Sequence, residues 1–249
     1  MIFDLMPSEE VQRATAEKLG NWAENLNQEQ KDAFETLPIR RDVITFLEYL
    51  EENRTVGTQS TGNLPLKAVH AIGETFVKPL VLEETIGDKT YKVRSEDEVW
   101  PLVFVHTLAY FANLVTGGPS RIWKVTADGQ LFPQLPSPIQ VFYLFTCWWA
   151  QIDWAIAYPV SGLADGLPMD FKAEALESLR KLPEGVSTPY EPFADDLIAQ
   201  SGLEWPSQDQ TMVQTIKRSV IKRVLVDPMV RFGVLECQYG TENIGRHDY

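Results

Sequence analysis

Hydrophobic residues recur every three or four positions over the first part of the chain. This spacing is typical of amphipathic helices, and it predicts helices over residues 8–25, 27–37 and 41–52. Ser8 stands before two glutamates, as expected where a helix begins, and Pro38 is expected to end the second helix. The chain is therefore expected to open with three consecutive helices.

A strand-and-turn pattern then occurs twice. In residues 55–69 an alternating strand leads to a polar turn closed by Gly62, and Pro65 begins a helix. Residues 122–133 repeat this order when Gly129 is aligned with Gly62. A long helical pattern precedes each copy, so the sequence predicts two copies of one supersecondary unit.

Shorter signals divide the region between the two copies. Residues 79–97 are expected to form a loop or a hairpin around Gly87. Ser95 and Glu98 have the spacing of a capping box at the start of a strongly apolar helix over residues 99–115. Gly and Pro follow that helix and predict a firm stop.

The segment 139–157 is apolar on so many sides that it must be covered. Gln140, Gln151 and Asp153 argue against a membrane span, so a buried helix is expected and no membrane contact is predicted. Its aromatic residues fill the core, or they form a partner-binding surface through Trp148, Trp149 and Trp154.

The last part of the chain is punctuated by Pro and Gly. Residues 164–206 are interpreted as a covering segment with a helix over 170–181, which Asp170 could cap. A final helix is predicted over 207–226, followed by an alternating strand over 230–238. This helix and strand are interpreted as a degenerate third copy of the unit.

Three segments carry a resemblance to a known family: residues 61–67 (TGNLPLK), 96–102 (EDEVWPL) and 123–129 (WKVTADG). They resemble stretches of an uncharacterised bacterial family related in pattern to plasmid pRiA4b ORF-3-type proteins. The resemblance covers about residues 40–160 and implies winged-helix-like modules. It implies no activity and no catalytic residues.

Together these patterns predict an α+β, mostly helical protein with two or three winged-helix-like units packed around a buried Trp-rich helix. We expect three parts. Residues 1–78 hold the N-terminal helices and the first unit. Residues 79–163 hold the second unit with the Trp-rich core helix, and residues 164–249 hold the covering segment and the C-terminal helix–strand unit.

The net charge constrains the partner. Lys and Arg number 22 and Asp and Glu number 35, so the formal charge is 22 − 35 = −13, which repels nucleic-acid phosphates at long range. The last predicted helix carries one basic cluster, Lys217, Arg218, Lys222 and Arg223. This cluster could bind DNA phosphates, or it could pair with the protein's own carboxylates. The two cysteines, Cys147 and Cys237, and the lack of a signal-peptide pattern predict a cytoplasmic protein with free thiols.

Candidate catalytic groups are sparse. His70 and Glu74 lie one turn apart on a predicted helix, and with His106 they would offer two imidazoles and a carboxylate to a metal ion. Asp153, Asp165 and Asp170 surround a loop, but turn and cap roles explain the last two more simply. No phosphate-cradling loop or zinc spacing occurs, and no catalytic residue, metal or cofactor is predicted.

The sequence therefore favours a non-enzymatic protein-interaction module with an adaptor or regulatory role. Two alternatives stay open. One is a sequence-specific DNA-binding transcriptional regulator that uses the basic cluster. The other is a metal-dependent hydrolase that uses His70, Glu74 and His106.

Overall fold

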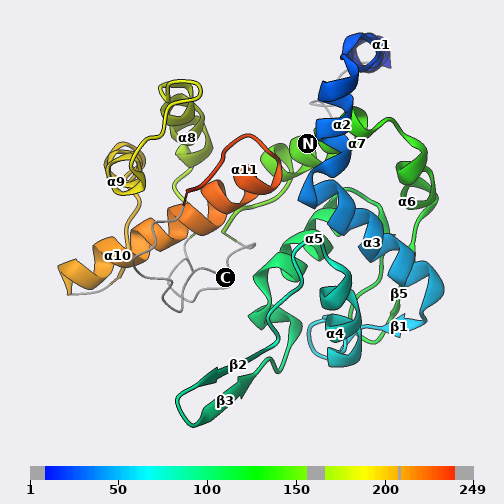
Figure 1. Ribbon diagram of the computed structural model, residues 1–249, viewed down its shortest axis with the longest axis horizontal. Helices are drawn as coiled ribbons and strands as arrows, with labels where there is room; N and C mark the ends of the chain where they lie inside the picture. Colours follow the sequence, from blue (N-terminus) through cyan, green and yellow to red (C-terminus); the bar gives the residue numbers. More distant parts are fainter. Residues whose placement is uncertain (1–8, 156–165, 207–208, 239–249) are drawn as a thin grey trace, which may run out of the picture.

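The computed structural model of the chain describes residues 9–155, 166–206 and 209–238 (Figure 1). Helices dominate these residues, and small antiparallel sheets accompany them, so the predicted α+β, mostly helical class is confirmed. The three expected N-terminal helices are present as α1 (Glu9–Asn25), α2 (Gln28–Thr36) and α3 (Pro38–Glu52). Ser8, the expected first cap, lies outside the described residues.

Local capping chemistry accounts for where α2 and α3 begin. The Asn27 side chain accepts a hydrogen bond from the Gln30 N–H, and the Gln30 side chain accepts one from the Asn27 N–H, so α2 begins with a reciprocal capping box. Pro38 takes the first position of α3, where its missing N–H costs no helical hydrogen bond.

The two predicted strands lie in the same sheet. Strands β1 (Thr55–Val56), β5 (Ile122–Val125) and β4 (Val115–Thr116) pair antiparallel in the order β1-β5-β4. Helices α4 (Leu66–Thr75) and α5 (Trp100–Phe111) separate β1 from β4 in the chain. From α3 onward the order is therefore helix, strand, helix, a two-stranded hairpin, helix, strand, strand.

The two aligned glycines adopt different conformations. Gly62 closes a turn with a φ of +82°, a value that favours glycine. Gly129 instead lies inside the short helix α6 (Ala127–Leu131), where its N–H donates to the Thr126 side chain at the cap. The prediction of a turn at Gly129 is wrong, because Thr126 caps a helix directly after β5. A 3₁₀ turn, Phe132–Gln134, follows α6.

The expected hairpin is confirmed and the capping box after it is not. Strands β2 (Glu83–Ile86) and β3 (Lys89–Lys92) pair across a turn in which Gly87 has a φ of +60°. This hairpin projects from the rest of the molecule (Figure 1). The Ser95 side chain makes no cap hydrogen bond, and a 3₁₀ turn, Glu96–Glu98, precedes α5. The reason is that the Glu96 side chain is buried, where it hydrogen-bonds to His106 and to the Leu64 N–H.

The Trp-rich segment forms α7 (Ser137–Ala150), which packs against α1, α2, α3 and α5. One hydrophobic cluster extends from Ile39 to Phe232 and includes Trp148 and Trp154, so a buried aromatic core is present as expected. α7 has 14 residues, fewer than the ~20 needed to cross a bilayer. Across the described parts of the chain, no helix combines the length and apolarity of a membrane span.

The C-terminal part is helical throughout its described elements. These are α8 (Phe171–Arg180), α9 (Tyr190–Ser201) and α10 (Gln210–Ile221), which continues through a π-helical turn (Lys222–Val226) into α11 (Asp227–Arg231). Asp170 precedes α8 without a side-chain cap hydrogen bond, so its expected capping role is not observed.

The strand predicted over residues 230–238 is wrong. The helix continues through Arg231 and ends at Gly233, which has a φ of +71°. The Gly233 N–H donates to Val230 O, and the Val234 N–H donates to Met229 O at 2.9 Å, the pattern of a Schellman motif. Between residues 209 and 238 there is thus no strand to complete a third copy of the unit.

Gly129 and Gly20 both lie in helices but differ in the space around them, so the same substitution is expected to have different effects at the two positions. Replacing Gly129 by Ala places a Cβ against Leu114 O and 2.6 Å from Val125 Cγ1, so we expect a loss of about 1–3 kcal/mol in unfolding free energy. Gly20 in α1 has nothing within 4 Å of its added Cβ, so Gly20→Ala is expected to be neutral or to stabilise by up to about 1 kcal/mol. Urea denaturation of both variants measures the difference. Equal effects would contradict the close packing of α6 on Leu114 and on Val125 of β5.

Candidate functional site

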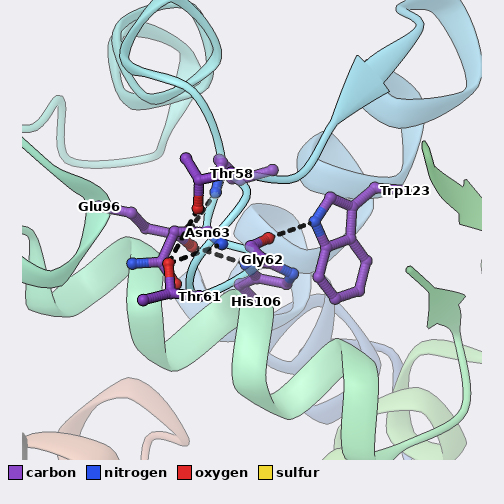
Figure 2. A network of polar contacts seen from close by, with 8 residues as sticks. Thr58, Thr61, Gly62, Asn63, Glu96, His106 and Trp123 are labelled. Carbon is purple, nitrogen blue, oxygen red and sulfur yellow. Dashed lines mark hydrogen bonds and ion pairs between the residues drawn. The ribbon is translucent and has the colours of Figure 1, made fainter. Parts of the chain in front are cut away.

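A buried carboxylate–imidazole pair lies between α5 and the turn that follows β1. Glu96 is 3% exposed and His106 is 8% exposed, and His106 Nδ1 lies 2.6 Å from Glu96 Oε1. The other carboxylate oxygen, Oε2, accepts a hydrogen bond of 2.6 Å from the Leu64 N–H. Glu96 therefore ties the end of the turn to the middle of α5 (Figure 2).

The turn itself, residues 58–64, is held by its own hydrogen bonds. The Thr58 N–H donates to Asn63 O at 2.8 Å, and the Gly62 N–H donates back to Thr58 O at 3.1 Å. From the sheet, Trp123 Nε1–H donates to Gly62 O at 2.7 Å (Figure 2). Because a side chain at Gly62 would collide with the backbone of Gly118, the turn packs directly on the β4–β5 loop.

A cleft of about 200 Å³ opens between this turn and α5, and we call it the turn–α5 cleft. Its floor is formed by Trp123 and His106, whose ring centroids lie 4.3 Å apart in an edge-to-face arrangement. Its rim carries two exposed aromatic side chains of α5, Tyr110 and Phe111, and the exposed carboxylate of Asp97. The site thus combines aromatic surface, one exposed negative charge and a buried imidazole.

One polar atom in this site has no partner. His106 Nδ1 is bonded to Glu96, whereas the other ring nitrogen, Nε2, is buried and makes no hydrogen bond within the described residues. An unsatisfied buried polar atom costs about 1–3 kcal/mol, and native proteins contain few of them. A group that hydrogen-bonds to Nε2 would recover part of this free energy.

The three residues proposed for a metal site do not converge. His70 and Glu74 are exposed on α4, whereas His106 is buried on α5 and bonded to Glu96. Across the described ranges, no three or more His, Cys, Asp or Glu side chains are grouped so that they could hold a metal ion. Asp153 and Asp170 are exposed, and Asp165 lies outside the described residues.

Two of the three tryptophans named as a partner surface are core residues. Trp148 and Trp154 are each 1% exposed and stack with centroids 4.7 Å apart, and Trp154 Nε1–H donates to Trp148 O. Trp149 is half-buried and stacks on Phe145. The core interpretation of these rings therefore replaces the partner-binding one for Trp148 and Trp154, whose surfaces a partner does not reach.

The basic cluster is partly engaged by the protein's own carboxylates. Arg218 donates to both carboxylate oxygens of Asp195 on α9, and hydrogen bonds from Arg218 and Gln214 lower the pKa of Asp195 to about 2. Arg223 lies 4.0 Å from Asp227 and also covers the Trp100 ring. Lys217 and Lys222 are half-buried on the same helical stretch. Arg218 and Arg223 therefore have structural roles.

Cys147 is confirmed as a core residue. It is buried in α7, and burial raises the pKa of its thiol to about 11. A thiol that stays protonated is a poor nucleophile, so this cysteine does not suit covalent catalysis.

Comparison of the chain with protein-family models, with curated proteins and with solved structures finds no match.

Local sequence pattern did not predict the Glu96–His106 pair. It placed Glu96 in a capping segment and grouped His106 with the wrong partners. One signal was present: His106 is the imidazole in a helix whose residues, apart from Thr107 and Tyr110, are otherwise apolar (WPLVFVHTLAYF). A buried histidine in such a helix requires a hydrogen-bond partner, and acidic residues stand just before the helix.

Proposed function

We propose that this protein is a winged-helix-like protein-interaction module with an adaptor or regulatory role in the cytoplasm, and that its partner binds in the turn–α5 cleft. Both cysteines are unpaired, which agrees with a reducing compartment. The partner surface proposed here differs from the Trp-rich one expected from the sequence, because Trp148 and Trp154 are buried.

The winged-helix part of the proposal rests on topology. A winged helix has the order helix, strand, helix, helix, strand, strand, with its first strand paired to its last. Here α3, β1, α4, α5, β4 and β5 follow that order, and β1 pairs with β5. The hairpin β2–β3 is then an insertion between the second and third helices. This supports one unit over residues 38–125, where the sequence suggested two or three.

The side-chain composition of α5 favours a protein partner over DNA. It occupies the position of the helix that reads DNA in helix-turn-helix proteins, yet it contains no Lys or Arg. Phosphate contacts need such cations, and they supply much of the affinity for nucleic acid. α5 instead exposes Tyr110 and Phe111, and aromatic side chains are the usual anchors of protein interfaces.

The same surface indicates the chemistry of the partner. Asp97 is the exposed charge among the residues that line the cleft, and the whole chain carries a formal charge of −13. A protein segment with an apolar or aromatic anchor next to Lys or Arg would pack on Tyr110 and pair with Asp97. Long-range attraction between opposite charges would also raise its association rate.

Affinity capture from the native cells tests this function, with the tagged parent protein and two variants treated with nuclease. Tyr110→Ala removes an anchor on the cleft, and a hot-spot loss of ~2 kcal/mol or more predicts at least about a thirtyfold weaker complex. Tyr91→Ala is the matched control, because Tyr91 is 48% exposed on β3 and Tyr110 is 49% exposed.

The proposal expects a partner that the parent and Tyr91→Ala retain after nuclease and that Tyr110→Ala loses. A partner retained equally by all three proteins would show that the cleft is not its binding site. Partners that disappear on nuclease treatment would favour a nucleic-acid complex instead.

A further inference from the structure

A second cavity, of about 280 Å³, lies away from the turn–α5 cleft, where the C-terminal helix α11 meets the start of α5. Its walls come from four separate segments: the start of α3, residues 77–81, the start of α5, and α11. Most of its lining is aliphatic, proline or tryptophan side chains. Small-molecule sites are typically concave, mostly apolar, and provided with a few polar groups.

The charged side chains that line this cavity are Asp42, Glu98, Asp227, Lys78 and Arg231, and Arg223, which lies over the Trp100 ring outside the lining, supplies the third positive charge. Asp42 accepts from Arg231 Nη1 at 3.2 Å and from the Val77 N–H at 2.8 Å, and Asp227 lies 4.0 Å from Arg223. Lys78 and Glu98 add one further charge of each sign at the exposed edge. A charged ligand would bring an uncompensated charge into this balanced site, which is costly in a poorly solvated environment.

Trp100 provides an unused hydrogen-bond donor. Its ring stacks on Phe104 with centroids 5.0 Å apart, and the guanidinium groups of Arg223 and Arg231 lie 5.1 and 5.5 Å from its centroid. Its Nε1–H is buried and has no acceptor among the described residues. Tryptophan N–H groups in protein interiors usually have a partner, so an acceptor is missing beside this cavity wall.

We infer that this cavity binds a small uncharged molecule with an apolar body and a carbonyl oxygen that accepts the Trp100 Nε1–H. The apolar lining takes the body of the ligand, and the balanced charges disfavour an acid or an amine. The carbonyl supplies the acceptor that Trp100 lacks. This site is independent of the turn–α5 cleft and does not rest on the proposed partner.

Fluorescence titration with two probes tests the inference on the full chain. The first is prodan, an uncharged aminonaphthalene that carries a ketone, and the second is the same aminonaphthalene without the ketone. Prodan is expected to bind one site per chain, with a saturable blue shift. Trp100→Phe keeps the ring shape and removes the N–H, so prodan should bind about two- to tenfold more weakly while the ketone-free probe is unaffected.

A blocking variant and a matched control complete the test. Val81 lines the cavity and is 49% exposed, so Val81→Trp should fill the site and abolish binding of both probes. Val186 lies outside the cavity and is 61% exposed, so Val186→Trp should bind as the parent does. Undiminished prodan binding to Val81→Trp, an equal loss of both probes in Trp100→Phe, or the absence of saturable binding would each overturn the inference.

Discussion

Replacing Glu96 by alanine is expected to lower the free energy of unfolding by about 2–6 kcal/mol, because two buried groups lose their hydrogen-bond partner and each unsatisfied group costs about 1–3 kcal/mol. The substitution removes the acceptor of the Leu64 N–H and the partner of His106 Nδ1 in one step. Both groups lie in the interior, so water does not replace the lost carboxylate without opening the structure. The turn after β1 should also lose its attachment to α5.

Urea denaturation followed by circular dichroism measures this loss, and two further variants show its origin. Glu96→Gln keeps one acceptor oxygen in a similar shape and should cost less than Glu96→Ala. Glu98→Ala, two residues away, removes an exposed side chain that accepts from the Arg94 N–H, and should cost about 0.5 kcal/mol or less. If Glu96→Ala proved as mild as Glu98→Ala, Glu96 would not anchor the turn.

Trp148→Ala is expected to cost about 3–5 kcal/mol, the usual price of truncating a buried aromatic ring to alanine. Trp148 stacks on Trp154 on one side and on Phe232 on another, with centroids 4.7 and 5.5 Å apart. Phe232 follows α11, so this ring joins the C-terminal segment to α7. Its loss should leave a cavity at that junction and weaken the attachment of α11.

Trp149→Ala is the internal comparison for this experiment. Trp149 is the same residue type on the same helix, but it is half-buried, so about 2 kcal/mol or less is expected. Thermal or urea unfolding of both variants gives the comparison. A larger loss for Trp149→Ala than for Trp148→Ala would contradict the placement of Trp148 at the centre of the aromatic core.

Local patterns in the sequence were enough to predict most of the helices. Hydrophobic spacing located α2 and α3, and Gly87 located the hairpin β2–β3. The amides within the apolar segment 139–157 correctly argued for a buried helix, now seen as α7. These features depend on residues a few positions apart, whose backbone preferences and side-chain periodicity act within one segment.

The errors lie where a local signal competed with a distant contact or a stronger cap. Ser95 and Glu98 have the spacing of a capping box. The Glu96 side chain instead hydrogen-bonds to His106 and to the Leu64 N–H, and residues 96–98 form a 3₁₀ turn. Residues 230–238 alternate like a strand, but no strand among the described residues pairs with them, and Gly233 follows the end of a helix there.

The functional surfaces depend on contacts between segments far apart in the chain. Glu96 meets Leu64, Arg218 meets Asp195, and Asp42 meets Arg231 only after the helices have packed. No periodicity in the sequence encodes such pairings, because each is chosen by the packing of whole elements and by the need to satisfy buried polar groups. Helix positions and the apolar core therefore followed from local pattern, whereas the turn–α5 cleft and the cavity beside Trp100 were created by tertiary packing.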